Sequence, residues 1–412
     1  MIDSEDLLAR FLAYVQIDTQ SSIHSETTPS TEKQWVLIRK LEGELKELGL
    51  ADVKVTPFGF VLATIPGTSK KTNAPRLAFL AHVDTADACP GRAKPIVHRS
   101  YDGSPIVLPD DPRQVLDTNS IPLLATKIGE DIVTASGATL LGADDKSGVA
   151  TVMAAAKYWI EHPEVPHGPV RICFNPDEEI GRGTEKLSLE ELAADAAYTL
   201  DAENLGEVDF ESFSAARAVL TFTGVAAHPG WAKGVMVNAM RLATEFLQAM
   251  PAESGPENAS GREGFIHPVE IVGTPEQVRI EMLLRDFEID GLAAKHRLVE
   301  KTVAKLREKE PRARINLEIY RQYANMRYWL ERDMRPVNYA MDAIRAAGLT
   351  PTTEAIRGGT DGSRLTERGL PTPNLFTGFH NVHSEKEWVS LQDMCKAAET
   401  LVHLARIWEE RA

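Results

Sequence analysis

The stretch Leu80-Ala81-His82-Val83-Asp84-Thr85 closes an apolar run that predicts a β-strand over Arg76–Ala81. A histidine and an aspartate, two positions apart, follow at the end of this strand. Residues i and i+2 of a strand point to the same side, so the Asp84 carboxylate can orient the imidazole of His82. A buried structural histidine with a polar neighbour gives the same pattern, and the motif alone leaves both interpretations open.

Two further segments place paired carboxylates beside apolar runs. Gly142-Ala143-Asp144-Asp145-Lys146-Ser147-Gly148 leads into a helix predicted over Ser147–Trp159, and Pro176-Asp177-Glu178-Glu179-Ile180-Gly181 follows the run Val170–Phe174. Adjacent carboxylates repel each other unless a cation neutralises them. In the first pair, one aspartate can bridge two metals while Asp145 caps the helix. In the second, one glutamate can bind metal while its neighbour acts as general base, although a solvated acidic turn reads the same way.

Asp201 and His383 complete the set of candidate residues. Asp201 follows the apolar run Ala197–Leu200, where an unpaired carboxylate would be costly to bury. His383 stands in Asn381-Val382-His383-Ser384, and the nearby His380 competes for the same role. Together these side chains form the mixed nitrogen and oxygen donor set that zinc accepts, and that cobalt or manganese could also occupy. A pair of such cations would activate water.

The order of the predicted elements indicates an α/β fold. A first helix is expected from Ser4 through Val15, and a capping box at Thr31-Glu32-Lys33-Gln34 is expected to open a second. Apolar strands separated by helices predict a largely parallel, mixed sheet flanked by helices. Sites in such sheets form at the carboxyl ends of strands, where the candidate residues fall. The predicted strands are Val53–Thr56, Gly59–Ile65, Arg76–Ala81, Val170–Phe174 and Ala197–Leu200.

A second, smaller domain is predicted to interrupt the first. Strand, helix, strand, helix and strand signals follow one another there, which is the pattern of a small α/β sandwich. The catalytic domain is therefore expected at residues 1–212 and 327–412, and the inserted lid domain at 213–326. The predicted elements of the lid are Ala218–Gly224, Val235–Met250, Val278–Phe287, Asp290–Lys309 and Arg314–Tyr320.

The long stretch from Asp87 to Asp131 is rich in Pro, Gly and Asp. A connection of this length inside a compact domain usually carries a function or forms a small structure of its own. The alternative is a surface flap without a role.

Composition limits the class of protein. The chain has 412 residues, 43% of them hydrophobic, and a net charge of −15. This acidic balance argues against nucleic acid or an anionic membrane as a partner. The acidic N-terminal sequence does not resemble a secretion signal. Three scattered cysteines, Cys89, Cys173 and Cys395, are typical of reduced thiols in a cytoplasmic protein.

Taken together, these motifs resemble the dinuclear zinc exopeptidase family that includes peptidase T, carboxypeptidase G and aminoacylase, and most closely its peptidase T branch. The resemblance extends over nearly the whole chain. The matching segments are Ala81–Thr85, Leu140–Gly148, Pro176–Gly181, His228-Pro229-Gly230 continuing from Ala232 to Ala239, Arg285-Asp286-Phe287 and Arg357–Ser363.

The resemblance implies two zinc ions and a ligand for each position. One zinc would be bound by His82 and Asp201, the other by Glu179 and His383, with Asp144 bridging both. It also selects His383 over His380, because the matching motif is Asn-x-His followed by a polar stretch before Trp388.

The resemblance implies catalytic and substrate-binding roles as well. Asp84 would orient His82, and Glu178 would be the general base. His228 of the lid would stabilise the oxyanion, and Arg285 would bind substrate. Further substrate-binding residues would be Arg357, Gly358 and Thr360.

The implied activity is removal of the N-terminal residue from short peptides, most of all tripeptides. A dipeptidase, an acyl-amino-acid deacylase or a carboxypeptidase would use the same metal site, and a non-catalytic metal- or peptide-binding protein is a more remote alternative. One departure concerns Ala202-Glu203-Asn204, where the branch usually has Gly-Gly. A homodimer is compatible with the sequence, which does not show one.

Overall fold

The computed structural model describes residues 2–50 and 52–412, and the chain divides into two compact units. Unit 1 consists of Met1–Phe210, Tyr328–Glu354 and Thr360–Ala412. Unit 2 consists of Glu211–Arg327 and Ala355–Gly359.

Unit 2 begins two residues before and ends one residue after the expected lid domain, and it includes one further segment. Residues Ala355–Gly359, which the sequence assigned to the catalytic domain, belong to unit 2. The reason is a short parallel pairing, in which β16 (Ala355–Ile356) lies beside β11 (Glu211–Ser212). Thr352, just before this strand, makes an isolated bridge with Glu207.

Unit 1 contains a seven-stranded mixed sheet with the order β1-β2-β8-β3-β9-β17-β10. Its four central strands, β8, β3, β9 and β17, run parallel, and the outer strands pair antiparallel. The predicted largely parallel sheet is thus confirmed. The strands are β1 (Lys54–Val55), β2 (Val61–Ile65), β3 (Leu77–His82), β8 (Val170–Asn175), β9 (Ala196–Ala202), β10 (Val208–Asp209) and β17 (Asn374–Phe376).

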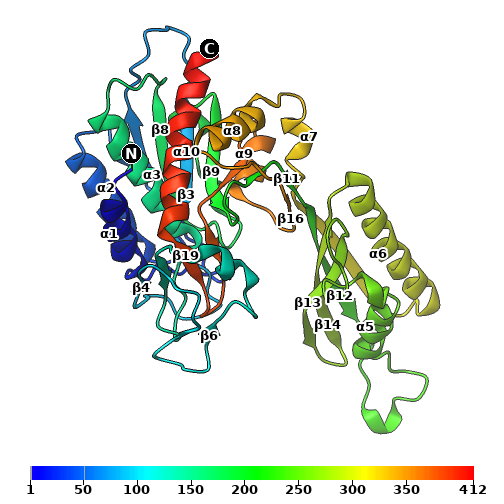
Figure 1. The fold of residues 1–412 in the computed structure, drawn as a ribbon. Coiled ribbons are helices and arrows are strands. Elements are labelled where there is room, and N and C mark those ends of the chain that lie inside the picture. The colour runs from blue at the N-terminus through cyan, green and yellow to red at the C-terminus, as the bar shows by residue number, and fades with distance from the viewer. Residues whose placement is uncertain (1, 51) are drawn as a thin grey trace. The chain divides into compact units, whose positions relative to one another are not determined.

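Helices cover both faces of this sheet because its central strands are apolar on both sides. Alternate residues of β3 divide between two cores: Leu77, Phe79 and Ala81 join the larger core, and Ala78 and Leu80 the smaller one. Figure 1 shows α10 running across the face of the sheet that carries the larger core. The helices on the larger core are α1 (Ser4–Val15), α2 (Gln34–Glu47), α3 (Ala143–Glu161), α8 (Arg335–Ala346) and α10 (Leu391–Glu410), and those on the smaller core are α4 (Leu189–Leu192) and α9 (Asp361–Glu367). A further short helix, α7, spans Arg327–Leu330.

The start of α2 departs from the predicted capping box. The helix begins at Gln34 without a side-chain cap. Thr31 Oγ1 donates instead to the carbonyl of Gln20, and the Gln34 amide donates to Asp177 Oδ1 at 2.7 Å. A hydrogen bond from Thr31 to Gln20 and one from Gln34 to the loop after β8 therefore replace the local capping pattern.

The stretch from Asp87 to Asp131 forms a small structure of its own. Its apolar residues, among them Tyr101, Leu108 and Leu124, pack around Trp388 in a separate cluster. One of its strands also joins a four-stranded sheet of order β18-β19-β7-β4, which supports the segment around His383. The elements are β4 (Ile96–His98), β5 (Ile106–Val107), β6 (Val115–Leu116), η1 (Pro122–Lys127), β7 (Ile132–Thr134), β18 (Phe379–His380) and β19 (Trp388–Ser390).

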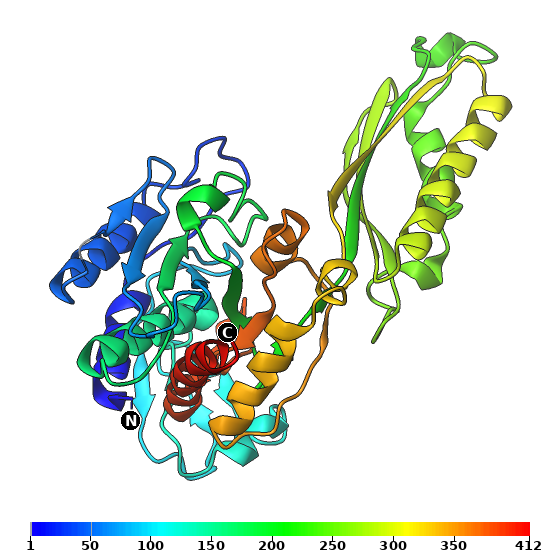
Figure 2. The same cartoon turned by 90° about the horizontal axis from the view of Figure 1, so that it is seen from above.

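Unit 2 is a four-stranded antiparallel sheet of order β13-β14-β12-β15, with its two main helices packed on one face around a shared apolar core (Figure 2). The predicted sandwich lacks one of these strands, β13, which the sequence left unassigned. The expected helix Val235–Met250 begins later, because the Asn238 side chain caps it. The elements are β12 (Ser214–Thr223), η2 (Pro229–Trp231), α5 (Ala239–Gln248), η3 (Ala252–Ser254), β13 (Phe265–Gly273), β14 (Gln277–Asp286), α6 (Ile289–Lys309) and β15 (Arg314–Tyr323). Across residues 2–50 and 52–412, none of the helices combines the length and apolar character needed to cross a membrane.

Gly148 fixes the distance between α3 and the sheet. A Cβ at this position would lie 2.6 Å from the carbonyl oxygen of Leu200 and would also meet Asp145 Oδ1. We expect Gly148→Ala to lower the free energy of unfolding by about 1–3 kcal/mol through overpacking, measured by chemical denaturation. Gly43→Ala, where a Cβ would contact nothing within 4 Å, is the control; equal stability of the two variants would contradict the close approach.

Candidate active site

The carboxyl ends of the central parallel strands bring the candidate residues of unit 1 together. His82 is the last residue of β3, Asp201 lies near the end of β9, and Glu178 and Glu179 occupy the loop after β8. The neighbouring segments after β18 and at the start of α3 contribute the other two residues, His383 and Asp144.

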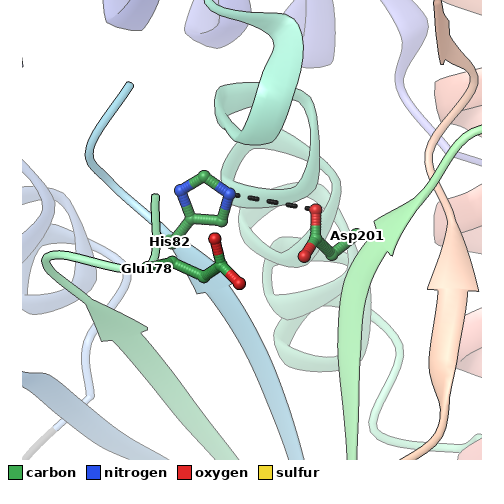
Figure 3. A group of neighbouring side chains, drawn as sticks. All are labelled: His82, Glu178 and Asp201. Atoms are coloured by element: carbon green, nitrogen blue, oxygen red, sulfur yellow. Dashed lines mark ion pairs between the residues drawn. The ribbon is translucent and has the colours of Figure 1, made fainter. Parts of the chain in front are cut away.

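The first cluster consists of His82, Glu178 and Asp201. One ligand atom from each residue lies within 4.8 Å of the others (Figure 3). His82 Nε2 is 3.8 Å from Asp201 Oδ1. One imidazole nitrogen and two carboxylates thus converge on a single point, as the ligands of a zinc ion do.

The second cluster consists of His82, Asp144 and Glu179, again with ligand atoms within 4.8 Å of one another. Asp144 Oδ1 lies 3.0 Å from His82 Nε2, and Asp144 Oδ2 lies 3.3 Å from His383 Nε2. His383 Nε2 is also 3.0 Å from Glu179 Oε2. The two oxygens of Asp144 therefore address different imidazoles, which is the arrangement of a carboxylate shared between two cations.

The two histidines and Asp144 stabilise one another's charged forms. Burial alone would lower the pKa of His82, but contacts with Asp144, Asp201 and Asp84 hold it well above the usual value. Hydrogen bonds with Asp144 and Glu179 raise the pKa of His383 to about 10. Burial opposes ionisation of Asp144, yet the two imidazoles keep its pKa below the usual range.

For Glu178 and Glu179, the neighbouring imidazoles do not offset the effect of burial on the carboxyl pKa. Burial, then the charge of Asp201, raises the pKa of Glu178 well above its usual value. Burial and Asp144 raise that of Glu179 to about 7. Two imidazoles face more carboxylates than they can neutralise, and such a set of oxygen and nitrogen donors fits divalent cations.

Asp84 is fully buried and connects two of the strand ends. His82 Nδ1 is 3.1 Å from the backbone carbonyl oxygen of Asp84 and 3.4 Å from its carboxylate. The carboxylate accepts hydrogen bonds from the backbone N–H groups of Glu178 at 3.0 Å and Glu179 at 3.2 Å. Asp84 therefore holds the His82 imidazole partly through its main chain, while its side chain fixes the Glu178–Glu179 loop.

The sequence left open the role of Asp145 and the choice between His380 and His383, and the contacts of these side chains differ. The buried Asp145 side chain accepts from the N–H of Gly148 at 3.1 Å and of His82 at 3.2 Å, so it caps the helix and ties it to β3. His380 packs against Trp388, with ring centroids 4.5 Å apart, whereas His383 contacts the carboxylates of the second cluster.

His228 lies in unit 2, directly before the short helix η2. Its Nδ1 accepts a hydrogen bond from the N–H of Gly230 at 3.2 Å, and its ring packs against the exposed Trp231. Because an imidazole nitrogen that accepts a hydrogen bond carries no proton, the neutral ring bears its proton on Nε2. His228 is thus prepared to donate from Nε2.

The predicted substrate-binding residues make structural contacts. Arg285 donates to the carbonyl oxygens of Ala216 and Leu284 and lies over the Tyr323 ring. Arg357 donates to the carbonyl oxygens of Ala259, Gly261 and Glu263. The Gly358 carbonyl accepts from the N–H of Phe213, and the Thr360 side chain caps α9.

The sequence did not assign a role to Asp361. The buried Asn175 amide, at the end of β8, donates to Asp361 Oδ2 at 2.6 Å, and burial raises the pKa of Asp361 to about 7. Its place in the Arg357–Ser363 motif was the available signal. Asp361 thereby joins α9 to the strand that leads to Glu178.

A model of peptidase family M20/M25/M40 matches residues 135–407. The chain belongs to this peptidase family. Over 409 residues, covering 99% of each chain, this M20 peptidase is 44% identical to a Peptidase T of Geobacillus kaustophilus (strain HTA426). It is also 45% identical to a Peptidase T of Exiguobacterium sp. (strain ATCC BAA-1283 / AT1b), over 98% of each chain.

Solved structures share the fold of this M20 peptidase. A tripeptidase from Staphylococcus aureus, 22% identical, matches with a TM-score of 0.78 over 100% of both chains. The aminopeptidase PepT from Bacillus cereus ATCC 10987, also 22% identical, matches with a TM-score of 0.75 over 99% of both. The predicted family, fold class and hydrolytic enzyme class are therefore confirmed.

Proposed function

We propose that this M20 peptidase is a metal-dependent aminopeptidase that removes the N-terminal residue from short peptides, with tripeptides as its preferred substrates. Full-length relatives at about 44% identity that carry the name Peptidase T support this assignment. The observation that carries it is the arrangement of Asp144, whose two oxygens lie 3.0 and 3.3 Å from two different imidazoles.

The proposed cofactor is a pair of zinc ions, with cobalt or manganese as substitutes. His82 and Asp201 would bind one ion, Glu179 and His383 the other, and Asp144 both. The donor set supports zinc, which accepts imidazole nitrogen and carboxylate oxygen without cysteine. When bound, such a pair lowers the pKa of water and polarises the substrate carbonyl.

Glu178 is the proposed general base. It takes a proton from the attacking water and returns it to the leaving amine. Burial raises the pKa of Glu178, which makes its carboxylate a stronger proton acceptor. Asp84 holds the backbone of Glu178 in place for this transfer.

His228 is the proposed oxyanion donor, through Nε2–H. The hydrogen bond from Gly230 to Nδ1 fixes the tautomer that this role needs. The substrate-binding roles of Arg285, Arg357, Gly358 and Thr360 remain predictions, and any contribution of the two arginines requires exchange of the backbone contacts described above.

A substrate-length profile tests the proposed specificity. With zinc restored after chelation, we expect kcat/KM for a tripeptide with a free N-terminus to exceed that for its N-acetylated form by about 10- to 100-fold. Loss of a charge-assisted hydrogen bond to the amine costs about 1.5–3 kcal/mol, which corresponds to this range.

The comparison set consists of the matching dipeptide, tripeptide, tetrapeptide and N-acetyl-amino acid. Cleavage of the N-acetyl-amino acid faster than that of the tripeptide would indicate a deacylase. Cleavage of the dipeptide faster than that of the tripeptide would indicate a dipeptidase. Removal of the C-terminal residue from the tripeptide would indicate a carboxypeptidase.

We infer a cytoplasmic location from the thiols. Cys89, Cys173 and Cys395 are free. Free thiols are typical of reducing compartments.

A further inference from the structure

Glu387 places a buried carboxylate against the loop that carries Asp144. The side chain is 1% exposed. Its Oε2 accepts a hydrogen bond from the N–H of Gly142 at 2.8 Å, and its Oε1 accepts from the N–H of Asp144 at 3.0 Å. Both oxygens are thus engaged by main-chain donors of one short segment. Gly142 adopts φ 77°, which a glycine permits without strain and which turns the segment at this point.

Glu387 also lies four residues after His383, in the turn that joins β18 to β19. The segment that carries one histidine therefore supplies the acceptor for the loop that carries Asp144. The side chains of His383 and Asp144 are also in contact, with His383 Nε2 3.3 Å from Asp144 Oδ2.

The same arrangement occurs on the other side of the site. Asp84, two residues after His82, accepts from the N–H groups of Glu178 and Glu179 at 3.0 and 3.2 Å. In each case a buried carboxylate just beyond a histidine takes two backbone N–H groups from a loop that bears the partner carboxylate. The two histidine segments thus hold the two acidic loops in the same way.

We infer that Glu387 is a positioning residue of the metal site: it holds the main chain of Gly142–Asp144 so that Asp144 presents one oxygen to each imidazole. This inference rests on the proposed function, because Asp144, which Glu387 positions, is a proposed ligand of both cations. Glu387 itself does not contact the ligand atoms of the two clusters; it acts through Asp144.

The geometry demands a carboxylate at this position. Two N–H donors need two acceptor oxygens, and an amide of the same shape offers one oxygen and one NH₂ group, which faces the second donor with another donor. Water cannot easily replace the lost acceptor in a site this buried. Replacement of partners that orient metal ligands typically lowers metal affinity by about 10- to 100-fold, and we expect this range for Glu387→Gln.

The test compares Glu387→Gln with a matched control, Glu409→Gln. Glu409 is also a buried glutamate of unit 1, and it lies on α10. Its Oε1 accepts a hydrogen bond from Ser69 Oγ at 2.6 Å, not from the loop of Asp144. Zinc affinity is measured by competition with a chromophoric chelator, and the visible absorption spectrum is recorded with cobalt bound. We expect weaker zinc binding and an altered cobalt spectrum for Glu387→Gln, and wild-type values for Glu409→Gln.

Wild-type zinc affinity and cobalt spectrum in folded Glu387→Gln would overturn the inference. So would equal losses in both glutamine variants, since these would indicate a general effect of removing a buried carboxylate. A wild-type protein that binds no zinc pair, or does not cleave tripeptides, would instead refute the proposed function and leave the two failures distinct.

Amide hydrogen exchange of the wild-type, metal-free protein gives a second measurement that needs no variant to fold. The N–H groups of Gly142 and Asp144 should exchange slowly before any metal is added, because Glu387 already engages them. Exchange at the rate of an unstructured peptide of the same sequence would contradict the inference.

Discussion

Replacing Glu178 by glutamine should lower kcat by about 10²- to 10⁴-fold while the protein retains its bound metal, because the variant loses the group that transfers the proton. The substitution preserves the shape of the side chain and the backbone hydrogen bond to Asp84. Steady-state kinetics on a tripeptide, together with elemental analysis of the same samples, measures both quantities. The loss in rate corresponds to about 3–5 kcal/mol of transition-state stabilisation.

The control for this prediction is Glu185→Gln. Glu185 is exposed and lies later in the same connection between β8 and α4, so its replacement should leave kcat unchanged. Near-normal kcat of Glu178→Gln at full metal occupancy would remove Glu178 from the role of general base. Loss of metal together with activity would instead assign Glu178 to the ligands of the first cluster, where its carboxylate lies beside His82 and Asp201.

Replacing Asp144 by asparagine should abolish the binding of the metal pair at micromolar free zinc. Asp144 is the residue that contacts both imidazoles, and asparagine has a single, uncharged acceptor oxygen. We expect a loss of affinity larger than the about 10- to 100-fold that replacement of an orienting partner causes. Equilibrium dialysis against buffered zinc, followed by elemental analysis, should then find fewer than two ions per chain.

Asp209→Asn provides a matched control for Asp144. Asp209 is also buried in unit 1, and burial together with Glu207 raises its pKa to about 9, so that the side chain is neutral near pH 7. Asparagine should therefore substitute for it with little effect on zinc. Two zinc ions bound with wild-type affinity in Asp144→Asn would exclude a bridging role.

The central part of the fold could be predicted from the sequence because its signals are local. The runs that form β3, β8 and β9 are apolar on both faces, which marks buried parallel strands. Once these strands are placed, their carboxyl ends locate His82, the Glu178–Glu179 loop and Asp201 near one another. The convergence of the site thus follows from topology and not from sequence spacing.

Elements at edges and boundaries could not be predicted in this way. Strand β13 lies at the edge of its sheet, contains Pro268 and exposes Val269, Ile271 and Val272, so that it shows no alternation of buried and exposed residues. The assignment of Ala355–Gly359 to unit 2 depends on a pairing of two very short strands far apart in sequence.

The contacts around the ligand atoms were also beyond the sequence. Glu387 stands beside the apolar run Trp388-Val389, and nothing local indicates that its two oxygens accept from a loop more than two hundred residues earlier in the chain. The capping box at Thr31 failed for a similar reason, since Gln34 is engaged by Asp177. In both cases a tertiary hydrogen bond decides the role of a residue whose neighbours in sequence are uninformative.

Anomalous diffraction from crystals of the active, metal-loaded enzyme tests the central claim most directly. Data collected above and below the zinc absorption edge should contain two peaks, one beside His82 and Asp201 and one beside Glu179 and His383, with Asp144 between them. Fully active crystals with no anomalous peak at these side chains, or with metal bound only elsewhere, would contradict the account.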